Sequence, residues 1–562
     1  MIKKLNEGKR IKNYISLTIV YLVSQWFLLV ASGRWWDDWV YANKNWDYLF
    51  EVFLQSSLPL HAFINAGLWL FPDGFNRILT FFLFYGGSII LYEILGKIEC
   101  FKGDAKLWIT LLYIVIPIND ARITWICFGY SLGLFMYWLA FYFAIISREK
   151  QGAKGIVYHV LSLIFLLISF DTESIMMLTV LILLYFYYED LRVDFHWNEV
   201  LLNIKKMCRS IIMHIDYLIA PVAWYILDKV LFPGYGIYGG HSYISWDTLP
   251  SVILNTPKNA AITFNGIISS YLSLIKESWI AQYSIVIIVG LYVLKMIIDY
   301  RKGRKRTEKD NAYVKYIIMI ILGAGIFFLG FFPYAVKHNS AIDNIYVRGR
   351  DSLLLGIGTA IVMYYVIKLC LKEHIAKIIM ISLICLGIIH FNYIYLDWQE
   401  CYYQQVQLQH EIKQNEEIRS NDTFLIMYDG DIICSNYYQT NGNSWAATGE
   451  ETRYYMPGTH ALSGLIEMTD DTWSLNAYGM SDYDYGEKVI DGIIFVDYAD
   501  IGRKTILKQK LNELFHKADF DDWIDEIKNI KFVKITREES DTILNLYKNK
   551  ELRNKTIYDM YY

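Results

Sequence analysis

The chain has 562 residues, of which 54% are hydrophobic, 17% aromatic and 20% charged. Soluble proteins carry about 25% charged residues, so this composition indicates that lipid surrounds much of the chain. The formal net charge is only −4, and the Lys and Arg residues are spread over many short polar stretches, which excludes nucleic acid as a partner.

Apolar runs of about the length that crosses a bilayer recur between residues 15 and 396. They predict a mainly α-helical, polytopic membrane protein with about eleven transmembrane helices. The expected transmembrane domain covers residues 1–398, with long outward loops at 33–77, 233–280 and 334–351. The expected spans are residues 15–32, 78–96, 107–118, 131–147, 156–170, 174–188, 211–232, 281–298, 315–333, 352–371 and 376–396.

The charges between the spans predict the orientation. Basic residues gather in the N-terminal MIKKLNEGKR, after the second and fourth spans, and in RKGRKRTEK at 301–309. Cytoplasmic loops carry the excess of Lys and Arg, so we expect a cytoplasmic N-terminus on an uncleaved first helix. An odd number of spans then places the C-terminal residues outside. Abundant Tyr, Lys, Asn and Ile are typical of low-GC bacteria, which favours a bacterial plasma or inner membrane.

Residues 399–562 are more polar and predict a soluble extracytoplasmic α/β domain. The strand-like stretches FLIMYD, GIIFVDY and IKFVKI alternate with helix-like ones such as RKTILKQKLNELFHKA. The seven cysteines form neither a metal-binding spacing nor a disulfide framework, and a single Cys401–Cys434 bridge stays an open alternative.

An acidic pair, Asp37 and Asp38, stands among tryptophans in GRWWDDW directly after the first span. Transfer of a sugar to a hydroxyl needs a carboxylate that takes the hydroxyl proton, and such help is worth about 10²–10⁴ in rate. Two adjacent carboxylates also raise each other's pKa or bind a divalent cation. Trp35, Trp36 and Trp39 would offer faces on which a sugar stacks. The alternative is a solvated acidic loop beside an ordinary interfacial aromatic belt.

This loop is followed by WDYLFEVFLQSSLPLHAFINAGLWLF, which reads as helices lying along the membrane surface. Together with the odd number of spans and the outward C-terminal domain, it resembles the GT-C superfamily of polyprenyl-phosphate-dependent glycosyltransferases. The resemblance implies a GT-C-like membrane fold and a catalytic base in the first outward loop, at Asp37 or Asp38. It also implies that basic residues of a late outward loop hold the donor phosphate.

Two arginines, Arg348 and Arg350, stand in YVRGRD before the tenth span, on the face that is otherwise poor in basic residues. Guanidinium groups bind phosphate oxygens in a bidentate manner and stabilise charge on a leaving phosphate. We therefore expect both to bind the donor phosphate, with Lys337 and His338 as weaker candidates. Simple anchoring in lipid headgroups is the alternative.

Three further candidates are less specific. Asp171 and Glu173 form a tight turn between two short apolar runs, where ionisable groups are costly and tend to be functional, although a turn also needs polar residues. His241 lies in PGYGIYGGHSYISWDTLP, whose glycines and tyrosines suit a mobile cover. A lone histidine is more often structural. Asn119, Asp120 and Arg122, in the second outward turn, are likewise either functional or structural.

The sequence thus predicts an inverting glycosyltransferase. It would move a sugar from a polyprenyl-phosphate carrier to a cell-surface glycan or teichoic-acid-like acceptor outside the membrane. No cofactor is expected to be required, a divalent metal stays an open alternative, and membrane lipid is the other expected partner. The rival hypotheses are a transporter or flippase of a lipid-linked sugar and a polysaccharide polymerase or ligase. The matched halves of many transporters are not found in the sequence.

Overall fold

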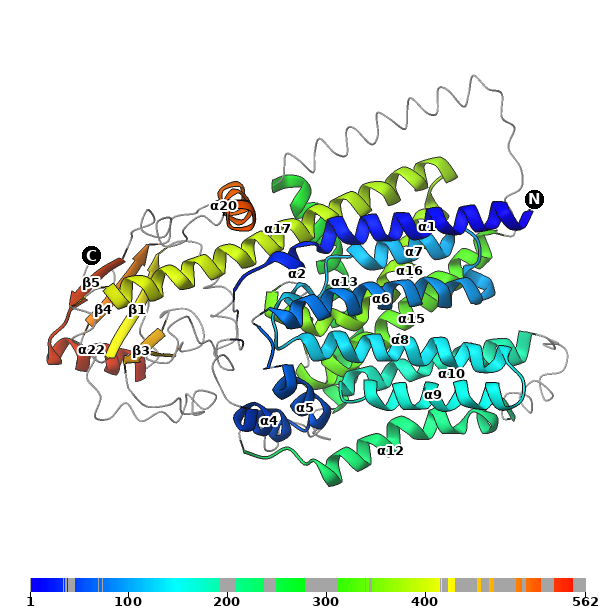
Figure 1. Cartoon of the computed structure of the whole chain (residues 1–562), viewed down its shortest axis with the longest axis horizontal. Coiled ribbons are helices and arrows are strands. Elements are labelled where there is room, and N and C mark those ends of the chain that lie inside the picture. Colours follow the sequence, from blue (N-terminus) through cyan, green and yellow to red (C-terminus); the bar gives the residue numbers. More distant parts are fainter. Residues whose placement is uncertain are drawn as a thin grey trace, which may run out of the picture. The chain divides into compact units, whose positions relative to one another are not determined.

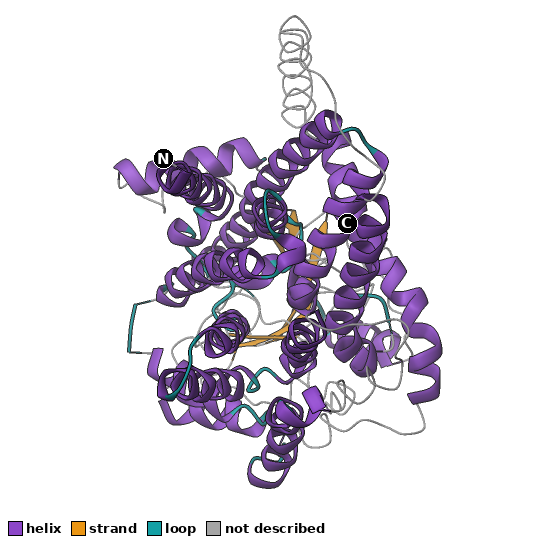
Figure 2. Cartoon of the chain, turned by 90° about the vertical axis from the view of Figure 1, so that its right-hand side faces the viewer, coloured by secondary structure: helices purple, strands orange, loops and turns teal. Residues whose placement is uncertain are grey.

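The computed structural model of the chain describes residues 2–33, 35, 38, 46–68, 70–72, 74–192, 209–236, 249–277, 312–338, 340–342, 346–414, 416, 423–429, 452–455, 464–468, 492–497, 502–516 and 530–548. Contacts divide the chain into two units. We call them the helical unit (Met1–Leu29, Phe50–Ile123 and Cys127–Asn392) and the sheet unit (Val30–Leu49, Thr124–Ile126 and Tyr393–Tyr562). Helices make up most of the described residues, and the described strands belong to the sheet unit (Figure 2).

The helical unit is a bundle whose helices run alternately in opposite directions (Figure 1). Helix α8 packs on α6 and α9, α15 packs on α13 and α16, and α7 packs on α1, α6 and α16. The helix ends therefore gather at two opposite ends of the bundle. The main helices are α1 (Ile2–Gln25), α6 (Phe75–Lys97), α7 (Ala105–Val115), α8 (Phe128–Glu149), α9 (Ala153–Ser169), α10 (Thr179–Arg192), α12 (Ile215–Leu231), α13 (Leu249–Glu277), α15 (Ala312–His338), α16 (Gly356–Cys370) and the first part of α17 (Glu373–Gln414).

Five stretches of helix are long and apolar enough to cross a membrane: Phe75–Lys97, Phe128–Glu149, Val314–Lys337, Gly349–Cys370 and Glu373–Glu400. The protein is accordingly a membrane-embedded helical protein, as its composition predicts. Two more apolar helices, α7 and α9, are shorter. The expected span 281–298 and the basic segment 301–309 lie outside the described residues.

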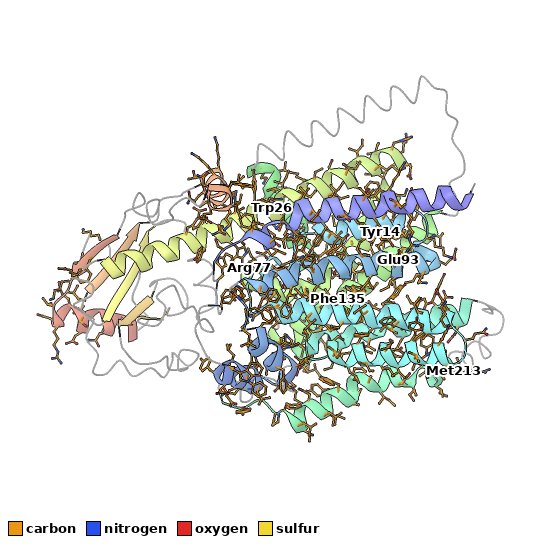
Figure 3. All side chains as sticks on the ribbon, viewed as in Figure 1. Tyr14, Trp26, Arg77, Glu93, Phe135 and Met213 are labelled. Carbon is orange, nitrogen blue, oxygen red and sulfur yellow. The ribbon has the colours of Figure 1, made fainter. Side chains whose placement is uncertain are left out.

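The end of the bundle at which α1 begins and α6 and α8 finish is what we call the basic end. Lys9 Nζ lies 2.9 Å from Asp104 Oδ1, next to the start of α7, and Lys97 Nζ lies 2.7 Å from Glu149 Oε1. A polar contact farther along the same helices joins α1 to α6, because the Tyr14 hydroxyl hydrogen bonds to the Glu93 carboxylate (Figure 3). The basic end also carries Arg10, Lys102, Arg148, Lys154 and Lys368.

Helix α7 is shorter than the expected span 107–118. It has 11 residues, which is about 16 Å of helix and too little to cross a hydrocarbon core of about 30 Å. It ends at Val115, two residues before Pro117, whose ring disfavours helical backbone in the residue before it. A Cβ at Gly387 of α17 would lie 2.2 Å from the Val115 carbonyl oxygen, so this glycine lets α17 pack directly on the end of α7.

Within the expected outward loop 233–280, residues Leu249–Glu277 form a 29-residue helix, α13, that the sequence pattern does not predict. Its buried side chains recur every three or four residues and form one stripe: Val252, Thr256, Ala260, Thr263, Ile267, Tyr271 and Leu274. This stripe is the pattern of an amphipathic helix packed on a neighbour, here α15. The Asn, Ser and Thr residues along α13 lower its hydropathy, which is why a search for apolar runs misses it.

The sheet unit contains a five-stranded mixed sheet in the order β2-β3-β1-β4-β5. The strands are β1 (Thr423–Asp429), β2 (Thr452–Tyr455), β3 (Gly464–Met468), β4 (Gly492–Asp497) and β5 (Ile530–Lys534). Only β1 and β4 are parallel, with Leu425 opposite Ile493, and the other neighbours are antiparallel. The sequence pattern predicts β1, β4 and β5 but neither β2 nor β3.

Two helices, α20 (Arg503–His516) and α22 (Arg537–Lys548), complete the described part of the sheet unit. Arg503 of α20 makes a bidentate ion pair with Asp397 of α17, at 2.6 Å and 2.9 Å. Planar two-point pairs of this kind fix geometry as well as charge. Helix α17 is continuous from Glu373 to Gln414, and its residues from Tyr393 onward belong to the sheet unit. The domain boundary that the sequence predicts at 398 therefore falls inside this helix.

Candidate functional site

Three short 3-10 helices lie at what we call the loop end of the bundle, opposite the basic end. They are η2 (Asp120–Ile123), η3 (Glu173–Leu178) and η5 (Tyr346–Leu355). η5 packs on η2 and α15, and η3 packs on α8, α9 and α15. Irregular backbone at membrane depth needs protein partners for its polar groups, and the Asn119 amide indeed donates to Ser352 Oγ at 2.9 Å. The loop end is thus a packed protein surface.

Six charged side chains gather at the loop end, and we call them the charged cluster. Lys337 lies within electrostatic reach of Glu173, Arg350 and Asp351. Glu173 in turn links this group to the end of α12. The members are Glu173 of η3, Asp228 and Lys229 of α12, Lys337 of α15, and Arg350 and Asp351 of η5. Four elements far apart in the sequence therefore supply one set of three cations and three carboxylates.

Lys229 is the most firmly held member of the charged cluster. Its Nζ donates to Glu173 Oε1 at 2.6 Å and to Asp228 Oδ2 at 3.4 Å. The side chains of Lys229 and Asp228 are only 13% and 4% exposed, so water screens this pair weakly. Arg350 makes a looser ion pair, because its Nε lies 3.6 Å from Asp351 Oδ1.

Next to the charged cluster, hydroxyl groups join α15 to η3. The Tyr334 and Ser174 hydroxyls lie 3.1 Å apart, and Tyr334 is buried. The cations of the charged cluster are of the kind that binds phosphate oxygens, and its carboxylates accept hydrogen bonds from hydroxyl groups. The arrangement therefore suits a molecule that carries both phosphate and hydroxyls.

Asp171 belongs to a separate, buried arrangement. Its carboxylate accepts the backbone N–H groups of Leu60 at 3.1 Å and His61 at 2.9 Å, and it also contacts the His61 ring at Nδ1. It thereby caps the first turn of α5 (Pro59–Leu68), one of the helices expected along the membrane surface. A Cβ at Gly129 of α8 would overlap the His61 ring, so only glycine fits there. Asp171 is placed as an anchor of α5.

In the sheet unit, the Asp38 carboxylate is also held by backbone groups. Oδ1 accepts the N–H groups of Trp125 at 2.8 Å and Ile126 at 3.1 Å, and Oδ2 accepts that of Trp35 at 3.2 Å. Asp38 is 1% exposed. A carboxylate has about four lone-pair directions, so at least three are taken by these donors. This geometry favours a role in fixing the loop over a role as the proton acceptor.

Trp35 does not offer the sugar-stacking face that the sequence allowed. The side chain is fully buried, and its indole N–H donates to the Trp398 carbonyl oxygen at 2.5 Å. The two rings meet edge to face, with centroids 5.9 Å apart. Burial of both rings leaves no surface for a ligand, and the pair instead ties the first loop to α17 within the sheet unit.

Arg122 is likewise a structural residue. It is 2% exposed and donates to the carbonyl oxygens of Asn119 at 2.6 Å and Ile118 at 2.8 Å. Its guanidinium also lies over the rings of Phe84 and Phe391, at 4.1 Å and 5.1 Å from their centroids. These contacts surround a buried charge within η2, where the Nη1 atom of Arg122 is buried and has no hydrogen-bond partner among the described residues.

The structure brings Lys337, Arg350 and Glu173 together. Asp171 is bound by His61 and by the N–H groups at the start of α5, and it also lies within electrostatic reach of Asp228 in the charged cluster. Asp37, Trp36 and His241 lie outside the described residues. For Arg348 and His338 only the backbone is described, in η5 and at the end of α15.

Three residues of these arrangements are missed by sequence reasoning: His61, Asp228 and Lys229. The adjacent Asp228 and Lys229 stand at the end of an apolar run, where ionisable residues are costly unless they have partners. Their position therefore indicates a polar site that sequence reasoning could have found. His61 has no comparable signal.

Among the described residues, no group of three or more His, Cys, Asp and Glu side chains could hold a metal ion. No family model, no curated protein and no solved structure matches the chain. The charged cluster and the sequence are therefore the features of the chain that bear on its function.

Proposed function

We propose that the protein is an inverting glycosyltransferase that moves a sugar from a polyprenyl-phosphate carrier to a cell-surface glycan or teichoic-acid-like acceptor. The observation that supports this most is the charged cluster. In it, Arg350 pairs with Asp351, and Lys337 lies within electrostatic reach of Glu173 and Asp351. A lipid-linked sugar phosphate carries an anionic phosphate, sugar hydroxyls and an apolar tail. The cations of the charged cluster match the phosphate, and its carboxylates match the sugar hydroxyls.

In the proposed reaction, an acceptor hydroxyl oxygen attacks the anomeric carbon of the donor sugar, and the bond from that carbon to the phosphate oxygen breaks. Arg350 and Lys337, with Arg348, stabilise the charge that the departing polyprenyl phosphate gains. A carboxylate takes the acceptor proton. We assign this base role to Asp37, because three backbone N–H groups already occupy the neighbouring Asp38.

The proposal includes the expected membrane topology. About eleven helices would cross a bacterial plasma membrane, with the basic end in the cytoplasm and the loop end outside. The sheet of the C-terminal residues would belong to an extracytoplasmic α/β domain. The loop-charge rule supports this orientation, since Lys and Arg residues predominate at the basic end.

The test uses the purified full chain in detergent, a panel of polyprenyl-phosphate sugars, and candidate glycan acceptors. The assay measures acceptor glycosylation. Transport cannot be detected in it, because detergent leaves no membrane between two compartments. Arg350→Lys keeps the charge but loses the planar fork, so transfer should fall by at least about tenfold. Arg148→Lys, at the basic end, is the matched control and should retain activity.

The outcomes separate the rival functions. Donor binding without turnover across the panel would favour a transporter or flippase. Products that grow by many sugars or join preformed chains would favour a polymerase or ligase. Equal activity of Arg350→Lys and the wild type would remove the charged cluster from the mechanism.

A further inference from the structure

A cavity of about 420 Å³ lies at the basic end of the helical unit, away from the charged cluster. Ligand pockets in proteins commonly measure roughly 300–1,000 Å³, so this one is large enough for a small ligand or a headgroup. It is walled by the turn between α6 and α7 and by the adjoining ends of α7, α15, α16 and α17. Its lining includes Cys100, Trp108, Lys315, Tyr316, Tyr365 and Lys368.

The two carboxylates of this cavity already have cationic partners. Asp104 Oδ1 lies 2.9 Å from Lys9 Nζ. Glu373 pairs with Lys368 and, at 3.1 Å, with Lys377. Three lysines thus neutralise two carboxylates, which leaves a surplus of positive charge around the cavity.

Of the two remaining lysines of the lining, Lys315 increases this surplus, whereas the charge of Lys102 is offset by Glu99. Lys102 pairs with Glu99, but both side chains are about half exposed, so the pair is weak. Lys315, in the first turn of α15, makes no ion pair with any residue that the structure describes. An anionic group in the cavity would therefore meet at least one ammonium group with no competing carboxylate.

The position of the cavity matches the depth of lipid headgroups. Its wall is built where Gly349–Cys370 ends and where Val314–Lys337 and Glu373–Glu400 begin. Trp108 and the Tyr316 ring belong to the lining, and such amphipathic rings prefer the membrane interface. Beyond it, α15 exposes Val314, Ile317, Ile318 and Ile321, a surface that suits acyl chains.

We propose that this cavity binds the phosphate headgroup of an anionic membrane lipid, with Lys315, Lys102 and Lys368 as the cationic contacts. The hydroxyls of Tyr316 and Tyr364 would donate to the phosphate oxygens, since that of Tyr365 already donates to the Cys100 carbonyl oxygen at 3.2 Å. The acyl chains would follow the apolar face of α15. Soluble phosphate esters share the phosphate chemistry of the headgroup but lack acyl chains that would contact the apolar face of α15. The site is independent of the sugar-transfer proposal, because it lies at the opposite end of the bundle.

The test measures lipid retention by the purified full chain with native mass spectrometry. Phosphatidylglycerol is compared with phosphatidylcholine, in the wild type, in Lys315→Ala and in Lys154→Ala. Lys154 is an exposed lysine of the basic end that does not line the cavity, which makes it the matched control. Phosphatidylglycerol affinity should fall about fivefold in Lys315→Ala, since one lysine near an anionic surface contributes about that much.

A second readout uses Cys100, a free thiol of the lining. Short-chain phosphatidylglycerol should slow its alkylation but not that of Cys370, which is exposed and outside the lining. Protection of Cys100 by inorganic phosphate as strong as that by the lipid would overturn the lipid assignment. So would equal loss of lipid in Lys315→Ala and Lys154→Ala, or unchanged retention in Lys315→Ala.

Discussion

Replacement of Asp38 tests whether this residue fixes the first loop or acts as the catalytic base. Asp38→Ala leaves three N–H groups without their acceptor: that of Trp35, which is buried, and those of Trp125 and Ile126, which are partly buried. An unsatisfied buried group costs about 1–3 kcal/mol and a partly buried one costs less, so we expect a total loss of roughly 3 kcal/mol. For a unit of this size, 1 kcal/mol corresponds to about 2–4 °C, which predicts a fall of roughly 6–12 °C in the unfolding temperature.

Asp38→Asn should cost much less, since its remaining side-chain oxygen still accepts the N–H groups of Trp125 and Ile126. Heating followed by size-exclusion chromatography in detergent measures the apparent unfolding temperature of both variants. Asp37→Asn is the partner experiment, and it should abolish sugar transfer without a change in that temperature. The reasoning is refuted if Asp38→Ala unfolds at the wild-type temperature, or if Asp38→Asn stays stable and loses all transfer while Asp37→Asn keeps it.

Three further outcomes follow from the same contacts. Gly129→Ala would force the His61 ring out of its position, so the unfolding temperature of this variant should drop by the equivalent of about 1–3 kcal/mol. The control is Gly325→Ala, whose Cβ would meet nothing within 4 Å and which should not lower the unfolding temperature. Burial raises the pKa of the Cys100 thiol to about 11, with Lys315 opposing the shift, so its alkylation rate should keep rising with pH until about that value; a plateau near the pKa of an ordinary cysteine thiol would contradict this. A tag at the C-terminus should be labelled from outside intact cells and one within 301–309 should not, and the reverse pattern would invert the topology.

The proposed glycosyltransferase function has two separate grounds, the sequence pattern that predicts a GT-C enzyme and the charged cluster. The first depends on the acidic loop and the order of spans in the sequence. The second depends on contacts among side chains of η3, α12, α15 and η5. If Asp37→Asn keeps full transfer, the sequence pattern loses its catalytic base while the charged cluster still supports the proposal. If Arg350→Lys keeps full transfer, the charged cluster loses its role while the acidic loop still supports the proposal.

The sequence by itself determines the membrane class of this protein and the position of most of its apolar helices. Hydrophobicity and helical period are local properties, so α6, α8, α15 and α16 can be read from runs of about 20 residues. Clustering of Lys and Arg between these runs also predicts the basic end, because charge between spans is local too. The strands β1, β4 and β5 follow for the same reason.

Only the tertiary structure decides which polar residues share a site. Asp171 and His61 are 110 positions apart, and Glu173 and Lys229 are 56 apart, so no local pattern assigns the first carboxylate to an anchor and the second to the charged cluster. Packing also decides α13. Its polar residues mask the helical pattern in the sequence, and its apolar stripe becomes buried only against α15. A polar side chain in a membrane protein is defined by the partner that compensates it, and that partner is set by packing rather than by neighbours in the chain.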